Sequence, residues 1–352
     1  MYLTGARLVG VGPFEDEFFP FSDDDGEPRM VTVVSGGSGV GKTTLLSAIA
    51  ATRPGHAMVL VAEVDPAGDT TRPNFAVCDW RLGMDDPDRP HALRVASPTA
   101  RLSDDDALEA LRRREQALFD RLAKENGFAF LSFSAARWFS RQPLALHAPA
   151  RTIGRYDVRA PASFDDASHS DLGRETKQAL AYAAIARALA ATSAESSRRP
   201  ELVGHAMHTA VNQLVELDGF EYRGLDPHSF EPGFRDESGR LRAFDALPTR
   251  ARHLVAFAAL TVRTLAAAYP LRDPLEAEGV VLIDEVDLYQ DESNLHRLLP
   301  ALRAALPSVQ WILTTSSAAV AGAADTRDVL ALRRTPGKNR VEVFVGSEAR
   351  TH

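Results

Sequence analysis

The stretch Gly36-Gly37-Ser38-Gly39-Val40-Gly41-Lys42-Thr43-Thr44 matches the pattern G-x-x-x-x-G-K-[ST] and decides the fold. It lies between an apolar run at 30–34, which predicts a strand, and the run 43–51, which predicts a helix. Glycines let the backbone turn its N–H groups toward phosphate oxygens, and the helix dipole adds to that field. We expect Lys42 to reach the β and γ phosphates of a nucleotide, Thr43 to ligate Mg²⁺ and Thr44 to contact the α-phosphate.

A second apolar run, at 279–283, ends in two acids and predicts a buried strand with the other half of a hydrolytic site. Asp284 would hold the Mg²⁺ shell and Glu285 would polarise the attacking water, because phosphoryl transfer needs mainly positioning and charge compensation. Alone, this pattern could equally be a strand end followed by a helix cap. Its presence in the same chain as the Lys42 loop favours hydrolysis.

Composition and charge limit the cellular setting. The 352 residues are 45% apolar and 25% charged, with a formal charge of −8, so DNA contact would need a local basic surface. The single cysteine, Cys78, excludes an intrachain disulfide. We find neither a charged leader before a long apolar run nor about 18 consecutive uncharged apolar residues. We therefore expect a soluble, cytoplasmic protein without a membrane span.

Hydrophobic periodicity predicts the remaining elements. Strands are expected at 3–9, 18–21, 57–63, 75–79, 128–133 and 310–314, and a hairpin at 329–345. Helices are expected at 103–126, 171–191, 201–217, 249–269 and 294–306, and a loop at 225–239. In the helix expected at 103–126, Ser103 would be the N-cap, and the packed face would consist of Leu108, Leu111, Leu118 and Leu122.

The sequences VVLIDEVDLYQDE (280–292) and HRLLPALRAALPSVQWILTTSS (296–317) resemble ABC-type ATPases of the RecF, SMC and OLD-like class. The resemblance covers most of the chain. It implies an α/β P-loop NTPase with a mixed β-sheet core, an antiparallel N-terminal subdomain and an inserted helical lobe. The ATPase lobe would comprise residues 1–170 and 247–352, and the helical lobe residues 171–246. ATP and Mg²⁺ are the implied ligands.

In that class a signature motif opens a helix shortly before the Asp-Glu strand and meets the γ-phosphate of ATP bound to a second subunit. Its counterpart here resembles 247–252, in which Thr249 would supply a hydroxyl and Arg250 replaces a glycine. Arg250 could act catalytically, as an arginine finger does, or crowd the phosphate. Alternatively, Thr249 is only an N-cap, and Arg250 and Arg252 are solvated.

Three further positions follow from the resemblance. Ser316 stands where the class usually has a histidine at the γ-phosphate, so we expect slow or partner-dependent hydrolysis, because serine carries no titratable charge. Asp287 resembles an aspartate that communicates across the dimer, although it could instead cap the following helix. Gln142, or a neighbour within 137–142, could be the glutamine that senses Mg²⁺.

Partners remain open at this stage. The basic run 137–159, with Trp138, Phe139 and Tyr156, could contact nucleic acid or form surface salt bridges. The resemblance implies an ATP-dependent homodimer in a DNA-linked process such as repair or phage defence, together with a separate effector or nuclease chain. The alternative is a regulatory ATP switch that recruits a protein without DNA. The helical segment is too short for an extended coiled-coil arm.

Overall fold

The computed structural model describes residues 1–55, 57, 74–81, 93–125, 128–141, 144, 171–192, 198–335 and 340–351. Gln142, Tyr156 and nearly all of the strand predicted at 57–63 lie outside these residues.

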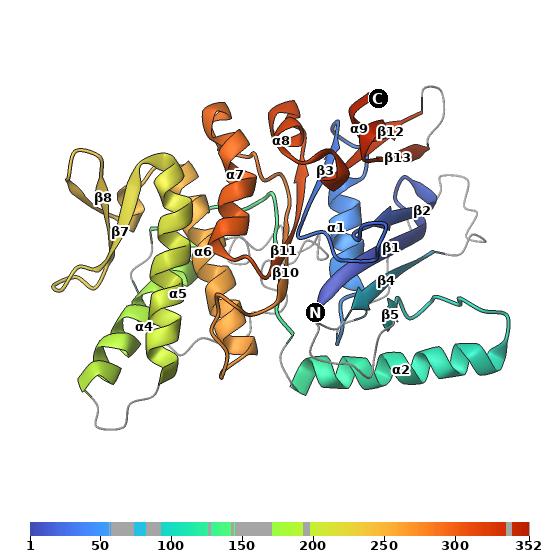
Figure 1. Ribbon diagram of the computed structural model, residues 1–352, viewed down its shortest axis with the longest axis horizontal. Coiled ribbons are helices and arrows are strands. Elements are labelled where there is room, and N and C mark those ends of the chain that lie inside the picture. Colours follow the sequence, from blue (N-terminus) through green and yellow to red (C-terminus); the bar gives the residue numbers. More distant parts are fainter. Residues whose placement is uncertain are drawn as a thin grey trace.

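A six-stranded sheet, in the order β13-β12-β3-β11-β10-β6, forms the centre of the molecule (Figure 1). Neighbouring strands are parallel, except that β13 runs antiparallel to β12. The carboxyl ends of β3, β10 and β11 therefore meet at one edge. The strands are β3 (Val31–Gly36), β6 (Phe130–Phe133), β10 (Gly279–Ile283), β11 (Val309–Thr315), β12 (Val329–Arg334) and β13 (Val341–Val345).

A second, antiparallel sheet in the order β2-β1-β4-β5 confirms the expected N-terminal subdomain. Helix α1 (Lys42–Ala51) buries Leu45, Leu46 and Ile49 in a core formed with residues from both sheets. The amide of Gln310, on β11, also joins the sheets: it accepts a hydrogen bond from the Leu3 N–H at 2.8 Å and donates to the Leu3 carbonyl at 2.8 Å. The strands are β1 (Tyr2–Val11), β2 (Phe14–Pro20), β4 (Phe75–Arg81) and β5 (Leu93–Ala96).

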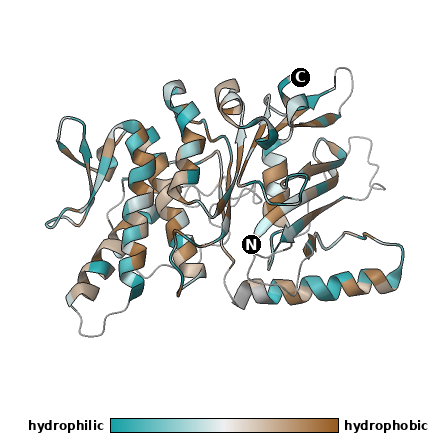
Figure 2. Ribbon diagram, in the orientation of Figure 1, coloured by the Kyte–Doolittle hydropathy of each residue, from teal (hydrophilic) through white to brown (hydrophobic). Residues whose placement is uncertain are grey.

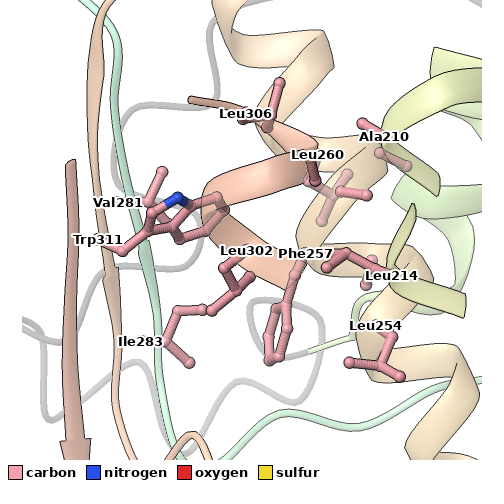
Figure 3. Packing of buried hydrophobic residues seen from close by; sticks show 14 of the residues in the cluster. Ala210, Leu214, Leu254, Phe257, Leu260, Val281, Ile283, Leu302, Leu306 and Trp311 are labelled. Atoms are coloured by element: carbon pink, nitrogen blue, oxygen red, sulfur yellow. The ribbon is translucent and has the colours of Figure 1, made fainter. Parts of the chain in front are cut away.

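Four helices build the larger core with the central sheet: α4 (Gly173–Thr192), α5 (Arg198–Val215), α6 (Thr249–Ala268) and α7 (Glu292–Ala305). Figure 3 shows Trp311 and Ile283 of the sheet beside Leu302 of α7 and Phe257 of α6. Figure 2 shows apolar residues along α6 and the central strands. Among the described helices, only α6 is long and apolar enough to span a membrane, but 83% of its apolar window is buried, as in a core helix. The shorter helices α8 (Ala318–Ala323) and α9 (Ser347–Thr351) complete the C-terminal part.

Two expectations are wrong in part. The region expected to be a loop at 225–239 contains the strand β8 (Pro232–Asp236), which forms a three-stranded antiparallel sheet with β7 (Phe220–Leu225) and β9 (Leu241–Ala243); the turns on either side of β8 are as expected. Its signal is weak, because few apolar residues, such as Tyr222 and Phe234, alternate with polar ones and become buried. Proline and glycine at the turns obscured that alternation.

The predicted packed face of the long helix α2 (Asp106–Glu125) is wrong at Leu108 and Leu111. Leu108 and Leu111 are exposed, whereas Phe119 and Ala123 are buried in the core around α1. Asp105, rather than Ser103, caps the helix, because its carboxylate accepts the N–H of Ala107 at 2.8 Å. A helix with apolar residues on two adjacent stripes leaves the choice between them to tertiary packing.

The contacts of Trp311 predict a large effect on stability. Its side chain is fully buried at the centre of the sheet, so we expect Trp311→Ala to lower the free energy of unfolding by about 3–5 kcal/mol through lost contacts and a residual cavity. Urea unfolding followed by circular dichroism measures this change. The control is Leu271→Ala, at a side chain that is 97% exposed, for which we expect a change below about 0.5 kcal/mol. Equal effects of the two substitutions would contradict this account of the core.

Candidate nucleotide site

The loop between β3 and α1 has the geometry that its glycines predict. Gly39 and Gly41 lie at φ of 74° and 96°, in the left-handed region that favours glycine. A Cβ on Gly41 would lie 2.6 Å from Pro13 and 2.7 Å from Phe14, so no larger residue fits. Lys42 folds back over the loop, and its ammonium donates to the carbonyls of Gly36 and Gly37, both at 2.8 Å.

The structure brings Thr43 and Asp284 together across 241 positions of sequence. The hydroxyl of Thr43 donates to Oδ2 of Asp284 at 2.8 Å, and the hydroxyl of Thr314, near the end of β11, donates to Oδ1 at 2.6 Å. A carboxylate and a hydroxyl are hard oxygen ligands of the kind that Mg²⁺ prefers. These two predicted metal ligands therefore fit the ion chemically.

Glu285 adopts an uncommon backbone conformation next to this carboxylate. Its φ is 46°, a left-handed value that is costly for a residue with a Cβ. Its N–H donates to the hydroxyl of Thr314 at 2.8 Å. Thr314 thus fixes both acids of the motif, although sequence reasoning did not include it in the site. Its place at the end of the strand that neighbours β10 was the available signal.

A cavity of about 410 Å³ opens over the loop and contains both Lys42 and Glu285 in its wall. Sequence reasoning missed three of its residues: Gly12 and Pro13, from the turn between β1 and β2, and Arg334, from β12. Arg334 donates to the carbonyl of Gly39 at 3.0 Å. The described lining residues are Gly12, Pro13, Ser38, Gly39, Gly41, Lys42, Thr43, Thr44, Glu285 and Arg334.

Arg137 departs from its expected place on an exposed basic surface. It is buried, and its guanidinium donates to the carbonyls of Ser134, Asp284 and Glu285 at 2.9, 2.6 and 2.7 Å. Burial lowers the pKa of Arg137 to about 10, against the raising effect of the nearby carboxylates, so the side chain stays cationic at neutral pH. The first residue of the basic run is therefore unavailable to nucleic acid.

The start of α6 excludes the simple alternative for Thr249 and Arg250. Thr249 is the first helical residue, after Pro248 at the N-cap position, and its hydroxyl accepts a hydrogen bond from Arg252 at 3.0 Å. Arg250 is not freely solvated, because it forms ion pairs with both Asp218 and Asp291. Neither Thr249 nor Arg250 is among the described residues that line the cavity around Lys42.

Asp287 and Ser316 lie close to the ends of β10 and β11. Asp287 accepts a hydrogen bond from the hydroxyl of Thr315 at 2.6 Å, and Asp291 occupies the N-cap position of α7, so the helix-cap alternative for Asp287 is wrong. Ser316 is exposed immediately after β11 and, among the described residues, is not part of the cavity wall.

His253 lies one turn inside α6 and packs near Arg137. Its Nδ1 is 2.7 Å from the carbonyl of Thr249, so Nδ1 carries the proton and donates it. Its ring stacks on Tyr289 with centroids 5.2 Å apart. Burial, and then the positive charge of Arg137, lowers the pKa of His253 to about 3. The imidazole is therefore neutral in the folded protein.

Comparisons with known proteins identify solved structures that have a similar architecture. No family model matches the sequence, and the curated proteins contain no match. The structure is similar to an Smc head bound to the C-winged helix domain of ScpA, with a TM-score of 0.54, 14% identity and 100% of both chains covered. It is also similar to the Pyrococcus furiosus Smc head with an extended coiled coil bound to the C-terminal domain of ScpA, with a TM-score of 0.50 and 15% identity over 99% of this chain and 98% of that chain.

At these identities the likeness establishes the fold alone. The chain has the α/β P-loop fold of ABC-type ATPase heads, as its resemblance to that class indicated. More particularly, the fold is that of SMC heads over nearly the whole chain.

The buried neutral imidazole of His253 predicts a pH dependence of stability. A histidine in the unfolded chain has a pKa near 6.5, whereas the folded pKa is about 3, so between these values only the unfolded chain binds the proton. The contribution of His253 to the free energy of unfolding therefore falls as the pH is lowered through this window. We expect His253→Phe to lose less stability than the wild type between about pH 7.5 and pH 5 in thermal unfolding.

The matched control is His205→Gln, because His205 is exposed on α5. It should not flatten the pH profile as His253→Phe does. Parallel profiles for His253→Phe and the wild type would show that His253 is not held neutral.

Proposed function

We propose that the chain binds ATP with Mg²⁺ and hydrolyses it slowly or on stimulation by a partner, as an ABC-type ATPase. The observation that carries this proposal is the hydrogen bond of 2.8 Å between Thr43 and Asp284. It unites the Gly36–Thr44 loop with the end of β10, while Lys42 and Glu285 share one cavity. A turn with a purely structural role would not require a lysine, a threonine hydroxyl and two carboxylates at the same place.

The proposed roles follow from the positions of these residues. The backbone N–H groups of the loop bind phosphate oxygens, and Lys42 exchanges its two carbonyl contacts for the β and γ phosphates. Thr43 and Asp284 hold Mg²⁺, with Gln142 as the further proposed ligand. When bound, the ion neutralises charge that develops on the phosphates. Glu285 orients the attacking water and accepts its proton.

A second subunit would complete the site. We propose an ATP-dependent homodimer in which Thr249, Arg250 and Ser316 of one subunit cover the γ-phosphate bound to the other. None of the three is among the described residues that line the cavity of their own subunit, which supports this arrangement. Arg250 would have to leave Asp218 and Asp291 to reach a phosphate, which supports slow turnover. In this scheme Asp287, held by Thr315, lies at the dimer contact.

The cellular process that ATP hydrolysis would drive is a separate part of the proposal. We favour a DNA-linked process, such as repair or phage defence, with a separate effector chain. We also propose that the protein is cytoplasmic and that residues 171–246 form the lobe inserted into the ATPase part, with the helices α4 and α5 and the sheet β7-β8-β9. The similar Smc heads are described as bound to ScpA, which supports a protein partner. A regulatory ATP switch without DNA is the second candidate, and it is favoured by the burial of Arg137, which removes one basic side chain of the run 137–159 from the surface.

Two substitutions test the hydrolytic site. We expect Lys42→Ala to abolish ATP binding, and Glu285→Gln to retain binding, lower turnover by about 100-fold or more and accumulate an ATP-bound dimer. Equilibrium binding, phosphate release and light scattering measure these three properties. Glu115→Gln, at an exposed glutamate of α2, should behave as the wild type. A Glu285→Gln protein that stays monomeric in saturating ATP would contradict the shared site.

Turnover with and without DNA separates the two candidate roles. A rise of about tenfold or more in the rate of phosphate release on addition of duplex or single-stranded DNA supports the DNA-linked process. An unchanged rate, with dimerisation on ATP alone, supports the regulatory switch. Lys42→Ala protein with the same DNA is the control for contaminating ATPases.

A further inference from the structure

A buried arginine behind the two acids has no part in the motifs that define the site. We infer that Arg137 is a positioning residue that holds Glu285 in the orientation needed for hydrolysis, an inference that rests on the proposed function. Arg137 lies outside the described wall of the cavity, so it would act through Glu285 rather than touch the nucleotide.

The hydrogen bonds of Arg137 fix the backbone on both sides of Glu285. Nη1 donates to the carbonyl of Asp284 at 2.6 Å, and Nη2 donates to the carbonyl of Glu285 at 2.7 Å. Successive carbonyls of an extended strand point in opposite directions, so one guanidinium can bind both only where the chain turns. The left-handed φ of Glu285, 46°, is that turn. The planar fork of arginine therefore matches the unusual conformation of the catalytic candidate.

The surroundings of Arg137 hold the guanidinium itself in place. Nη1 also donates to the carbonyl of Ser134, directly after β6, at 2.9 Å. The guanidinium lies over the ring of Phe257, with 5.4 Å to the centroid, and Phe257 packs against Phe133 at 5.0 Å. These contacts come from β6 and α6, so the turn at Glu285 is anchored to two elements outside its own strand.

The acceptors of these hydrogen bonds indicate that Arg137 positions the backbone and does not simply pair with a charge. Among the described residues, the hydrogen bonds of the Arg137 side chain go to three backbone carbonyls, two of which belong to the acids of the site. A hydrogen bond to a backbone carbonyl fixes the orientation of that peptide group, whereas an ion pair with a carboxylate would mainly compensate its charge. A lysine would preserve the charge but lack the planar fork, and it could not reproduce both bonds to Asp284 and Glu285.

The substitution Arg137→Lys tests this role. We expect the turnover number for ATP to fall about tenfold, and about 100-fold in Arg137→Met, whereas the ATP dissociation constant and KM change by less than about threefold. Thermal unfolding measured in parallel reports whether each variant is folded. If Arg137→Met does not fold, Arg137→Lys carries the test. Arg113→Lys, at an exposed position of α2, should leave the turnover number, the dissociation constant and KM unchanged.

Combining the substitution with Glu285→Gln distinguishes positioning from a general structural role. If Arg137 acts through Glu285, Arg137→Lys should produce no further loss of single-turnover hydrolysis in the Glu285→Gln background. An equal tenfold loss in both backgrounds, or a parallel loss of ATP binding, would overturn the inference. If Glu285→Gln itself retains full turnover, the proposed hydrolytic site fails, and the assignment of Arg137 fails with it.

Discussion

The carboxylate of Asp284, shared between two hydroxyls, is the contact on which the candidate site depends. Thr43 and Thr314 bind its two oxygens, so one side chain joins the loop after β3 to the ends of β10 and β11. The parallel order β3-β11-β10 makes this possible, because the carboxyl ends of all three strands meet at the same edge. The relative positions of Lys42 and Glu285 follow from this junction.

The sequence predicted the parts of the site that are short and continuous. The Gly36–Thr44 loop, the acids at 284 and 285, and helix α6 lie where periodicity and motif placed them. Arg137 and Arg334 could not be found in this way, because their roles depend on partners far away in sequence, at Glu285 and Gly39. Burial of Arg137 reverses its expected role, since composition favoured an exposed basic run. Residues 142, 143 and 145–159 of that run are not described, so its possible contact with nucleic acid stays a prediction.

The fold shows the same division between local and long-range information. The sheet β7-β8-β9 was missed because its apolar alternation is short, and the packed face of α2 was misplaced because two stripes competed. By contrast, β3, β10 and β11 at the centre of the six-stranded sheet are buried along almost their whole length, and their mostly apolar sequences are easier to recognise because both faces of the sheet are covered. Similarity to Smc heads at 14–15% identity shows how far this architecture tolerates sequence change.

The amide of Gln310 has a consequence for the energetics of ligand binding. By donating and accepting at Leu3, it locks the antiparallel sheet to the central one. The cavity takes Gly12 and Pro13 from the turn between β1 and β2 and Arg334 from β12, so the Gln310 contact links the two sheets that supply these parts of its wall. A nucleotide that enters would spend little of its binding free energy on ordering the protein. A site held in this way selects a ligand by how well the groups beyond the phosphates fit the shape of the cavity.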